Sequence, residues 1–309
     1  GKTSTSGSKR TAKIGVATGA PSLLSAVTSA GTTPPVLTVT GVPVATYNVR
    51  IECTLLGARG TWEFRWSIDG GANWVATAVV SAATVVLGST GITLAIATGS
   101  AATDNVWTFT AIPIPVTLYS DVTALVAALT SGPLVEACAD LLAEPNRDAE
   151  SLLVAPIYPS VAGTNTAVTQ SGAGPAVTLT GAPKDDYQIR AVVTLGGALG
   201  TSTIRYSLDG GDTYSAEQAT AATILMYDGA NSSGVTLNLA AGTYVLAEVY
   251  TATSTAPSFA NADVQNTIDA VKRAGYQFRL LHVVGRPGGA DDTAKVVAFA
   301  SLVAAVQTR

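Results

Sequence analysis

The chain has little charge. Lys, Arg, Asp and Glu together make up 12% of its 309 residues, against about 25% in typical soluble domains. With so few charged side chains, the protein has little charged surface to expose to solvent. This favours a subunit whose faces are covered by neighbouring molecules. The net charge is −4 and there is no block of basic residues, so we expect no nucleic-acid partner.

Residue types that commonly carry catalysis are also scarce. His282 is the one histidine, and its apolar surroundings favour a core or interface residue over a general base. The two cysteines, Cys53 and Cys138, fall in a strand-like and a helical segment, so we expect two buried thiols and no disulfide. We identify no catalytic, cofactor-binding or metal-ligating residue, and we expect a protein that is not an enzyme and has no cofactor.

A long apolar helix is missing as well. The stretch 70–103 carries no charged residue, but Gly88, Gly91 and Gly99 divide it into short runs. Such runs are typical of β-strands and are too short to cross a bilayer as a helix. We therefore expect no direct membrane insertion.

What the sequence does contain is a β-rich module that occurs twice. Residues of the first copy reappear 140 positions later (Gly41 to Gly181, for example), and after a slip of three positions the match resumes. The first set is Gly41, Tyr47, Arg50, Gly60, Arg65, Ser67, Asp69, Gly70 and Gly71, and the second is Gly91, Thr93, Leu94 and Gly99, which returns as Gly234, Thr236, Leu237 and Gly242. A repeat that preserves turn glycines and aromatic positions preserves shape, which favours a structural or binding protein over an enzyme.

Each copy contains a turn motif of the form Ser-x-Asp-x-Gly-x-x-aromatic. The residues are Ser67, Asp69, Gly71 and Trp74 in copy one and Ser207, Asp209, Gly211 and Tyr214 in copy two. The motif resembles the Asp-box hairpin of sialidase-like propellers, where Ser and Asp brace a turn and the aromatic residue packs beneath it. We expect a structural role here too. Calcium at Asp209 and Asp212 is a weaker alternative, because copy one has Ala72 instead of the second carboxylate.

The tryptophans of copy one allow two interpretations. Alternation places Trp66 on the inward face of a strand with Phe64 and Ile68. Trp62 lies on the same face but is replaced by Ser202 in copy two, so we expect it to be exposed. A tryptophan face that stacks on sugars is the alternative to core packing.

The segments around the two copies alternate helices with apolar strands. Residues 116–119 and 152–157 predict strands, and between them Ser120 or Asp121 caps a helix that ends at Ser131-Gly132 before Pro133 begins a second one. Asn261 is expected to cap a third helix that ends at Gly275. Residues 278–284 are apolar on both faces, which predicts a covered central strand.

Together these patterns predict an α+β fold, in which a discontinuous α/β body is interrupted by two homologous antiparallel β-sandwich or barrel modules. Residues 1–27 are assigned to an N-terminal arm and the first strand of the body, 28–113 to the first β module and 114–168 to a body segment. Residues 169–256 are assigned to the second module and 257–309 to the last body segment.

Three stretches of the body resemble the tail sheath proteins of contractile phages and related injection machines. They are KIGVATGAPS, VTLYSDVTALVAALTSGPLVEACADLLAE with the SLLVAPIYPS that follows, and FANADVQNTIDAVKRAGYQFRLLHVVGRP. Sheath proteins also carry inserted β domains on an α/β body. The resemblance implies a structural protein of the virion tail, assembled in the host cytoplasm, whose copies stack in six-fold rings as a helical assembly. The implied partners are the tail tube and the baseplate or terminator proteins, and contraction drives the tube into the host cell.

The resemblance also implies where assembly contacts lie. Lys2, Lys9 and Arg10 belong to an N-terminal arm that could contact acidic partners, and Lys272 and Arg273 belong to a helix that could face the tube. The alternative function is a β-sandwich adhesin or a carbohydrate-binding tail or baseplate protein. A pure binder of that kind does not need a body split by insertions.

Sheath proteins continue with further strands and a C-terminal arm after the helix that we expect at residues 293–307, so we expect the last body segment to be truncated. The chain should then be largely monomeric, because ordering a ten-residue arm costs about 1–2 kcal/mol per residue and the arm has little apolar area to offset this. Light scattering at micromolar concentration should give the mass of a single chain. Stable rings or tubes under these conditions would show that the strands needed to accept the arm of a neighbouring copy are present, and that the expected truncation is wrong.

Overall fold

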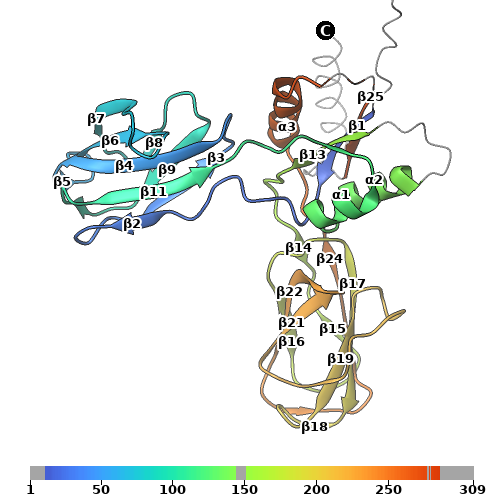
Figure 1. The fold of residues 1–309 in the computed structure, drawn as a ribbon. Helices are drawn as coiled ribbons and strands as arrows, with labels where there is room; N and C mark the ends of the chain where they lie inside the picture. The colour runs from blue at the N-terminus through green and yellow to red at the C-terminus, as the bar shows by residue number, and fades with distance from the viewer. Residues whose placement is uncertain (1–10, 144–150, 277, 279, 286–309) are drawn as a thin grey trace, which may run out of the picture.

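The fold is mostly β. The structure, a computed structural model, describes residues 11–143, 151–276, 278 and 280–285. Within these residues it contains three helices, several antiparallel sheets and one mixed sheet, which confirms the α+β class. Figure 1 shows three units: a body with the helices at the upper right, one β module to its left (module one) and a second below it (module two).

A four-stranded mixed sheet forms the centre of the body. Its strands lie in the order β12-β13-β1-β25, where β1 is Thr11–Val16, β12 is Thr117–Tyr119, β13 is Leu152–Ile157 and β25 is Leu280–Val284. The first strand pairs in parallel with both β13 and β25, and β12 pairs antiparallel with β13. The sheet therefore joins three parts of the chain that the two modules separate in sequence.

Helices cover both faces of this sheet. Helix α3 (Asn261–Arg273) packs on one face, and α1 (Val122–Leu129) and α2 (Pro133–Ala143) pack on the other. Alternate residues of β13 point to the two sides, so that Leu153 joins the core under α3 and Leu152 joins the core under α1 and α2. All six residues of β13 are buried, as expected for a strand covered on both faces.

The helices on the α1–α2 face begin where the sequence predicts. The Asp121 carboxylate accepts a hydrogen bond from the backbone N of Ala124 (2.8 Å), which caps α1. The chain then turns at Thr130, whose φ is 62°, and Pro133 is the first residue of α2. Proline suits this position because a helix leaves its first N–H groups without internal partners.

The start of α3 differs from the prediction. Asn261 is the first helical residue and not the cap, a position that Ala260 occupies. The Asp263 carboxylate replaces the expected cap, because it accepts from the backbone N of Ala260 (2.9 Å) and of Ser160 (2.8 Å). One carboxylate thus stabilises the helix start and ties it to the chain that leaves β13.

The expectation of a central strand at 278–284 is wrong for the described part of the chain. There β25 pairs with β1 alone and lies at the sheet edge, and Leu280 exposes 59% of its surface. The strand is apolar on both sides because Val283 packs toward the α3 core and Val284 toward the α1–α2 core. The apolar pattern reflects the helices that cover both faces of the strand. A strand with neighbours on both edges would show the same pattern, so sequence alone does not separate the two cases.

Module one is built from two antiparallel sheets that share one core. Its strands are β2 (Thr28–Ala30), β3 (Leu37–Gly41), β4 (Tyr47–Leu55), β5 (Gly57–Ala58), β6 (Glu63–Ser67), β7 (Ala76–Val80), β8 (Thr84–Val86), β9 (Ile92–Ile96), β10 (Ser100–Ala101) and β11 (Val106–Ala111). The larger sheet has the order β2-β11-β4-β6-β7, and the smaller one has the order β3-β9-β8. Strands β5 and β10 form a short separate pair.

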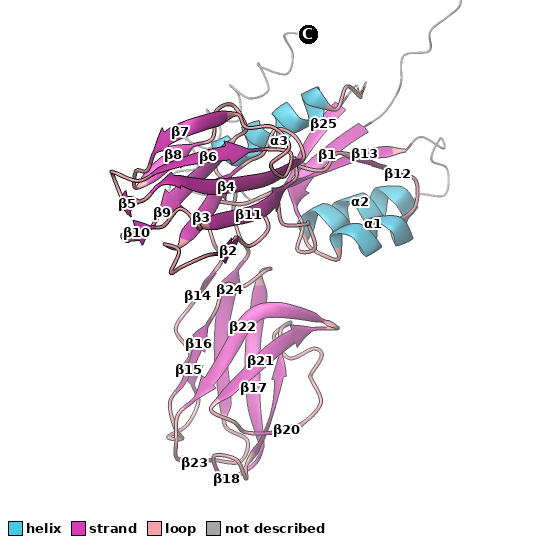
Figure 2. Ribbon diagram, turned by 60° about the vertical axis from the view of Figure 1, so that its left-hand side comes forward, coloured by secondary structure: helices cyan, strands magenta, loops and turns pink. Residues whose placement is uncertain are grey.

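Module two has the same strand order. Its strands are β14 (Thr164–Asn165), β15 (Thr169–Gln170), β16 (Val177–Thr180), β17 (Tyr187–Leu195), β18 (Gly197–Ala198), β19 (Thr203–Ser207), β20 (Gln218–Ala219), β21 (Thr223–Asp228), β22 (Asn231–Leu239), β23 (Thr243–Tyr244) and β24 (Val249–Thr255). The larger sheet runs β14-β24-β17-β19-β20, with β15 also on β24, and the smaller runs β16-β22-β21. Figure 2 shows this module extending away from the body along its strands.

Two neighbouring core positions differ in side-chain size between the modules, in opposite directions. Trp62 is 0% exposed and stacks on Trp107 with 5.6 Å between ring centroids, so the expectation that it is exposed is wrong. Its counterpart Ser202 is small, but the counterpart of Ala101 in module two is Tyr244, which is also buried. Trp62 N bonds to Ala58 and Ala101 pairs with the neighbouring Gly57, so the two positions lie together.

This exchange predicts strong coupling between the two positions. Trp62→Ser should lower the free energy of unfolding of module one by about 3–5 kcal/mol, because it leaves a cavity. Ala101→Tyr alone should cost about 1–3 kcal/mol by overpacking. The double variant should be more stable than the sum of the two changes implies, because it reproduces the pairing of module two.

Calorimetry on the full chain is the measurement, and Ser202→Trp with Tyr244→Ala in module two is the reciprocal control. Additive effects within about 0.5 kcal/mol would show that the two side chains do not fill a common space.

Candidate functional site

The turn motif of module one lies at the end of β6, where two side chains close the loop. Ser67 Oγ donates to Asp69 Oδ1 (2.5 Å) and accepts from Gly71 N (2.9 Å). The Asp69 carboxylate accepts from the backbone N of Asn73 (2.9 Å) and from its side-chain amide (2.7 Å). Both side chains therefore satisfy donors of the turn itself.

Module two repeats this arrangement with one different partner. Ser207 Oγ donates to Asp209 Oδ1 (2.6 Å) and accepts from Gly211 N (2.8 Å). Asp209 accepts from the backbone N of Thr213 (2.9 Å) and from its hydroxyl (2.5 Å). A threonine hydroxyl thus supplies the bond that an asparagine amide supplies in module one.

Two glycines make the turn possible. Gly70 and Gly71 have φ of 78° and 105°, a region that other residues enter only with strain. A Cβ on Gly71 would also lie 2.9 Å from Cδ of Arg50. Gly70 N donates to Asn48 O (2.8 Å), which fastens the turn to strand β4.

The aromatic residue of each motif lies under an arginine. The guanidinium carbon of Arg65 is 4.0 Å from the ring centroid of Trp74, and that of Arg205 is 4.3 Å from Tyr214. These are cation–π distances. In module one Glu52 also accepts from Arg65 (2.5 Å), whereas copy two has Val192 at the position of Glu52.

The hydrogen bonds determine the charge of the two carboxylates. The Ser67 hydroxyl, followed by the Asn73 amide groups, holds the pKa of Asp69 well below its ordinary value. Ser207 and Thr213 have the same effect on the pKa of Asp209. An ionised carboxylate whose oxygens accept turn donors is suited to bracing a loop and not to donating a proton.

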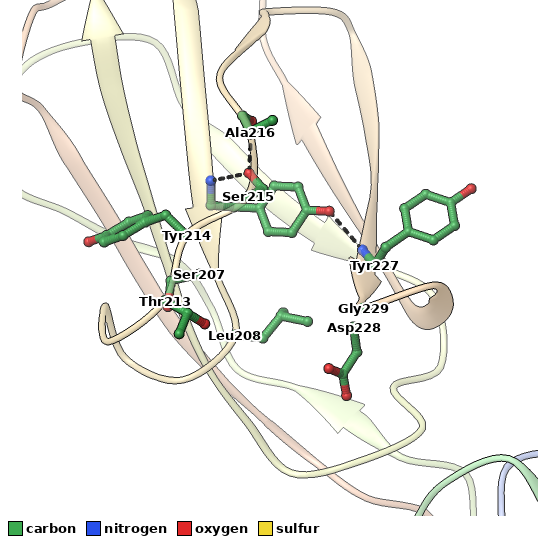
Figure 3. Close-up of a pocket in the computed structure, with 10 residues that line it drawn as sticks. Ser207, Leu208, Thr213, Tyr214, Ser215, Ala216, Tyr227, Asp228 and Gly229 are labelled. Atoms are coloured by element: carbon green, nitrogen blue, oxygen red, sulfur yellow. Dashed lines mark hydrogen bonds between the residues drawn. The ribbon is translucent and has the colours of Figure 1, made fainter. Parts of the chain in front are cut away.

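The structure also shows a pocket that the sequence motifs do not identify. It has a volume of about 350 Å³ and lies in module two between the turn motif and the tip of the β21–β22 hairpin. In Figure 3, Thr213 and Tyr214 lie on one side, Tyr227 and Asp228 on the other, and Leu208 between them. The sequence signal for this pocket is the change in offset between the two copies, because the extra residues of copy two lie in this hairpin.

The assembly residues suggested by the resemblance are placed only in part. Lys272 and Arg273 lie in the last turn of α3, where positive charge favours the helix end. Lys272 Nζ is 3.7 Å from the Asp269 carboxylate, and Arg273 is exposed at the rim of a hollow of about 290 Å³ near Pro113. Lys2, Lys9 and Arg10 lie outside the described residues.

The remaining titratable residues do not gather with the turn motifs. His282 is exposed on β25, so a place in the core is wrong for it. Cys53 and Cys138 are free and buried, as expected, and burial raises the pKa of the Cys138 thiol to about 11. In the described ranges no three His, Cys, Asp or Glu side chains converge in a way that could hold a metal ion.

The turn motifs predict a stability effect with a defined pH dependence. Asp69→Ala and Asp209→Ala should each lower the melting temperature at pH 7, because donors of the turn lose their acceptor. The folded-state pKa of each aspartate is depressed, so its stabilisation is complete above the unfolded-state pKa of about 3.9 and is lost as the pH falls further.

Thermal melts of the full chain at neutral and acidic pH test this. The difference between the wild type and each alanine variant should shrink below about pH 4, and Asp69→Asn, which keeps one acceptor oxygen, should fall between them at pH 7. An unchanged melting temperature at pH 7 would mean that the carboxylates do not brace the turns.

Among the helices that the structure describes, none combines the length and the apolar character needed to cross a membrane. No protein-family model, no curated protein sequence and no solved structure matches the chain. The function must therefore be argued from the residues and their arrangement.

Proposed function

We propose that the chain is a structural subunit of a contractile tail sheath, or of a related injection machine, that polymerises around a tail tube and contracts to drive it into a host cell. The observation that carries this proposal is the body sheet, which is built from three separate chain segments. The two β modules are insertions between those segments. The sequence resemblance implies a discontinuous α/β body, and a sheet assembled from separate segments supports that proposal.

The modules can be inserted without disturbing the body, because their ends lie together. The first and last strands of module one, β2 and β11, pair with each other. In module two β14 pairs with β24 in the same way. The chain therefore leaves the body and returns to it at one place for each module. The body is discontinuous in sequence but forms one unit in space, and such a body with surface modules suits a subunit of a larger assembly.

The body also offers a route for linking subunits. In the described residues β25 lies at the edge of the sheet, with one side of its backbone unpaired. An extended arm from a neighbouring copy can add a strand at such an edge. Contraction would then rearrange rigid bodies that stay connected by these arms. The partners in this proposal are further copies in stacked six-fold rings, the tube, and baseplate or terminator proteins.

Electron microscopy across a concentration series tests the proposal. Assembly follows mass action, so the chain, which we expect to be monomeric at micromolar concentration, should form rings or tubes near millimolar concentration or with a crowding agent. Six-fold rings with a central opening would support a sheath subunit. Discrete single particles at every concentration would contradict it and favour an adhesin or carbohydrate-binding tail protein.

The edge strand provides a matched pair of variants. Val283→Pro disturbs β25, the strand whose outer edge is unpaired in the described residues, and should abolish assembly, whereas Leu225→Pro changes an edge strand of module two and should leave assembly unchanged. Circular dichroism confirms folding in both. Equal assembly of the two variants would show that β25 takes no part in it.

A further inference from the structure

The pocket of module two has an apolar wall and polar groups around it. Leu208 and Tyr214 supply apolar surface next to the buried ring of Tyr206, and the hydroxyl of Thr213 and the carboxylate of Asp228 supply the polar groups. The volume of about 350 Å³ falls within the range of roughly 300–1,000 Å³ for small-molecule sites. Figure 3 shows the labelled side chains on opposite sides of the opening.

Two of the polar groups retain free hydrogen-bonding capacity. Tyr206 Oη accepts from the backbone N of Tyr227 (2.8 Å), so its own O–H can still donate. The side chain of Asp228 is exposed and makes no hydrogen bond or ion pair with another described residue. The pocket thus offers one donor and one acceptor next to aromatic surface.

Comparison of the copies shows why the pocket belongs to module two. In module one the position of Tyr206 is Trp66, and a Cβ added to Gly88 would lie 3.5 Å from Cη2 of its ring. The larger indole therefore extends to the turn between β8 and β9. In module two that hairpin is longer, with Tyr227 opposite Ser232 and Asp228 opposite Asn231. The smaller ring and the raised tip together open the space.

Carboxylates gather near Asp228, whereas the guanidinium of Arg205 lies over the ring of Tyr214. Burial and then the carboxylates of Asp185, Asp140 and Asp228 raise the pKa of Glu136. Burial and neighbouring carboxylates, with Asp228 among them, also raise the pKa of Asp185. The carboxylates disfavour an anionic ligand at the Asp228 side of the pocket.

We propose that this pocket binds a neutral sugar residue, such as the terminal unit of a glycan. A pyranose ring presents an apolar C–H face that can pack on Tyr214 and Leu208, and hydroxyls that can accept from Tyr206 and donate to Asp228. The donor of Tyr206 and the acceptor of Asp228, both near the hairpin tip, match a ligand that carries both functions. A sugar site in module two is independent of how the body assembles.

Saturation-transfer and amide-shift NMR on the full chain test the proposal. The probes are the methyl glycosides of glucose, galactose and N-acetylglucosamine, with N-acetylneuraminic acid as the anionic comparison and glucosamine as the cationic one. At least one neutral glycoside should shift the amides of residues 206–216 and 227–229, and the anionic sugar should not. Absence of transfer to all three neutral probes, or binding of glucosamine alone, would overturn the proposal.

Two variants locate the site. Asp228→Ala changes an exposed side chain and should weaken binding about tenfold, the effect of losing a hydrogen bond to a charged group. Tyr206→Trp places the residue of module one in the pocket and should abolish binding, whereas the reverse change Trp66→Tyr in module one should not alter it. Unchanged binding in Asp228→Ala and Tyr206→Trp would place the sugar elsewhere and refute this assignment.

Discussion

The arrangement of the whole chain depends on one constraint: the two ends of each β module must lie side by side. Backbone hydrogen bonds between the first and last strands meet this constraint, with Trp107 opposite Ser29 in module one and Thr164 opposite Thr255 in module two. If these pairs were not formed, the chain would leave the body at one point and return at another. The parallel pairing of β1 with β13 and β25 could then not hold three distant segments in register.

The two modules show which features of a repeated fold are fixed and which can vary. The turn is fixed, because Ser67 and Ser207 make the same bonds and the glycines that follow have the same left-handed conformation. The size of single core residues is not fixed, because a large residue at one position is balanced by a small one at its neighbour. The pair is Trp62 with Ala101 in one module and Ser202 with Tyr244 in the other. The hairpin tips are free to differ, and the difference between them creates the pocket.

Much of the fold could be predicted from the sequence, because the deciding signals are local. Alternation placed Phe64 and Trp66 on the inward face of β6, and Asp121 and Pro133 marked the starts of two helices in the body. The errors arose where the deciding contact is distant. Trp62 was placed outside because its counterpart is a serine, and only the fold shows that Tyr244 compensates.

The same limit applies to the candidate sites. The turn motif could be located from residue spacing alone, because its bonds join residues at most four positions apart. The pocket could not be found in this way, because it needs β19 and the tip of β21 to meet across two sheets. His282 was expected in the core or at an interface from its apolar neighbours, and the core is excluded because the side chain is exposed while Val283 and Val284 pack inward.

The discontinuous body sheet has a consequence for the order of folding. Thr11 pairs with Leu280, and Ala12 pairs with Leu153, so the body closes loops that each contain an entire module. Contacts of such sequence separation form slowly, because the entropy of a long loop is lost before the contact is gained. A module that has already folded shortens that loop, since its first and last strands are adjacent. Folding of each module therefore lowers the entropic cost of closing the central sheet and favours an order in which both insertions fold before the body.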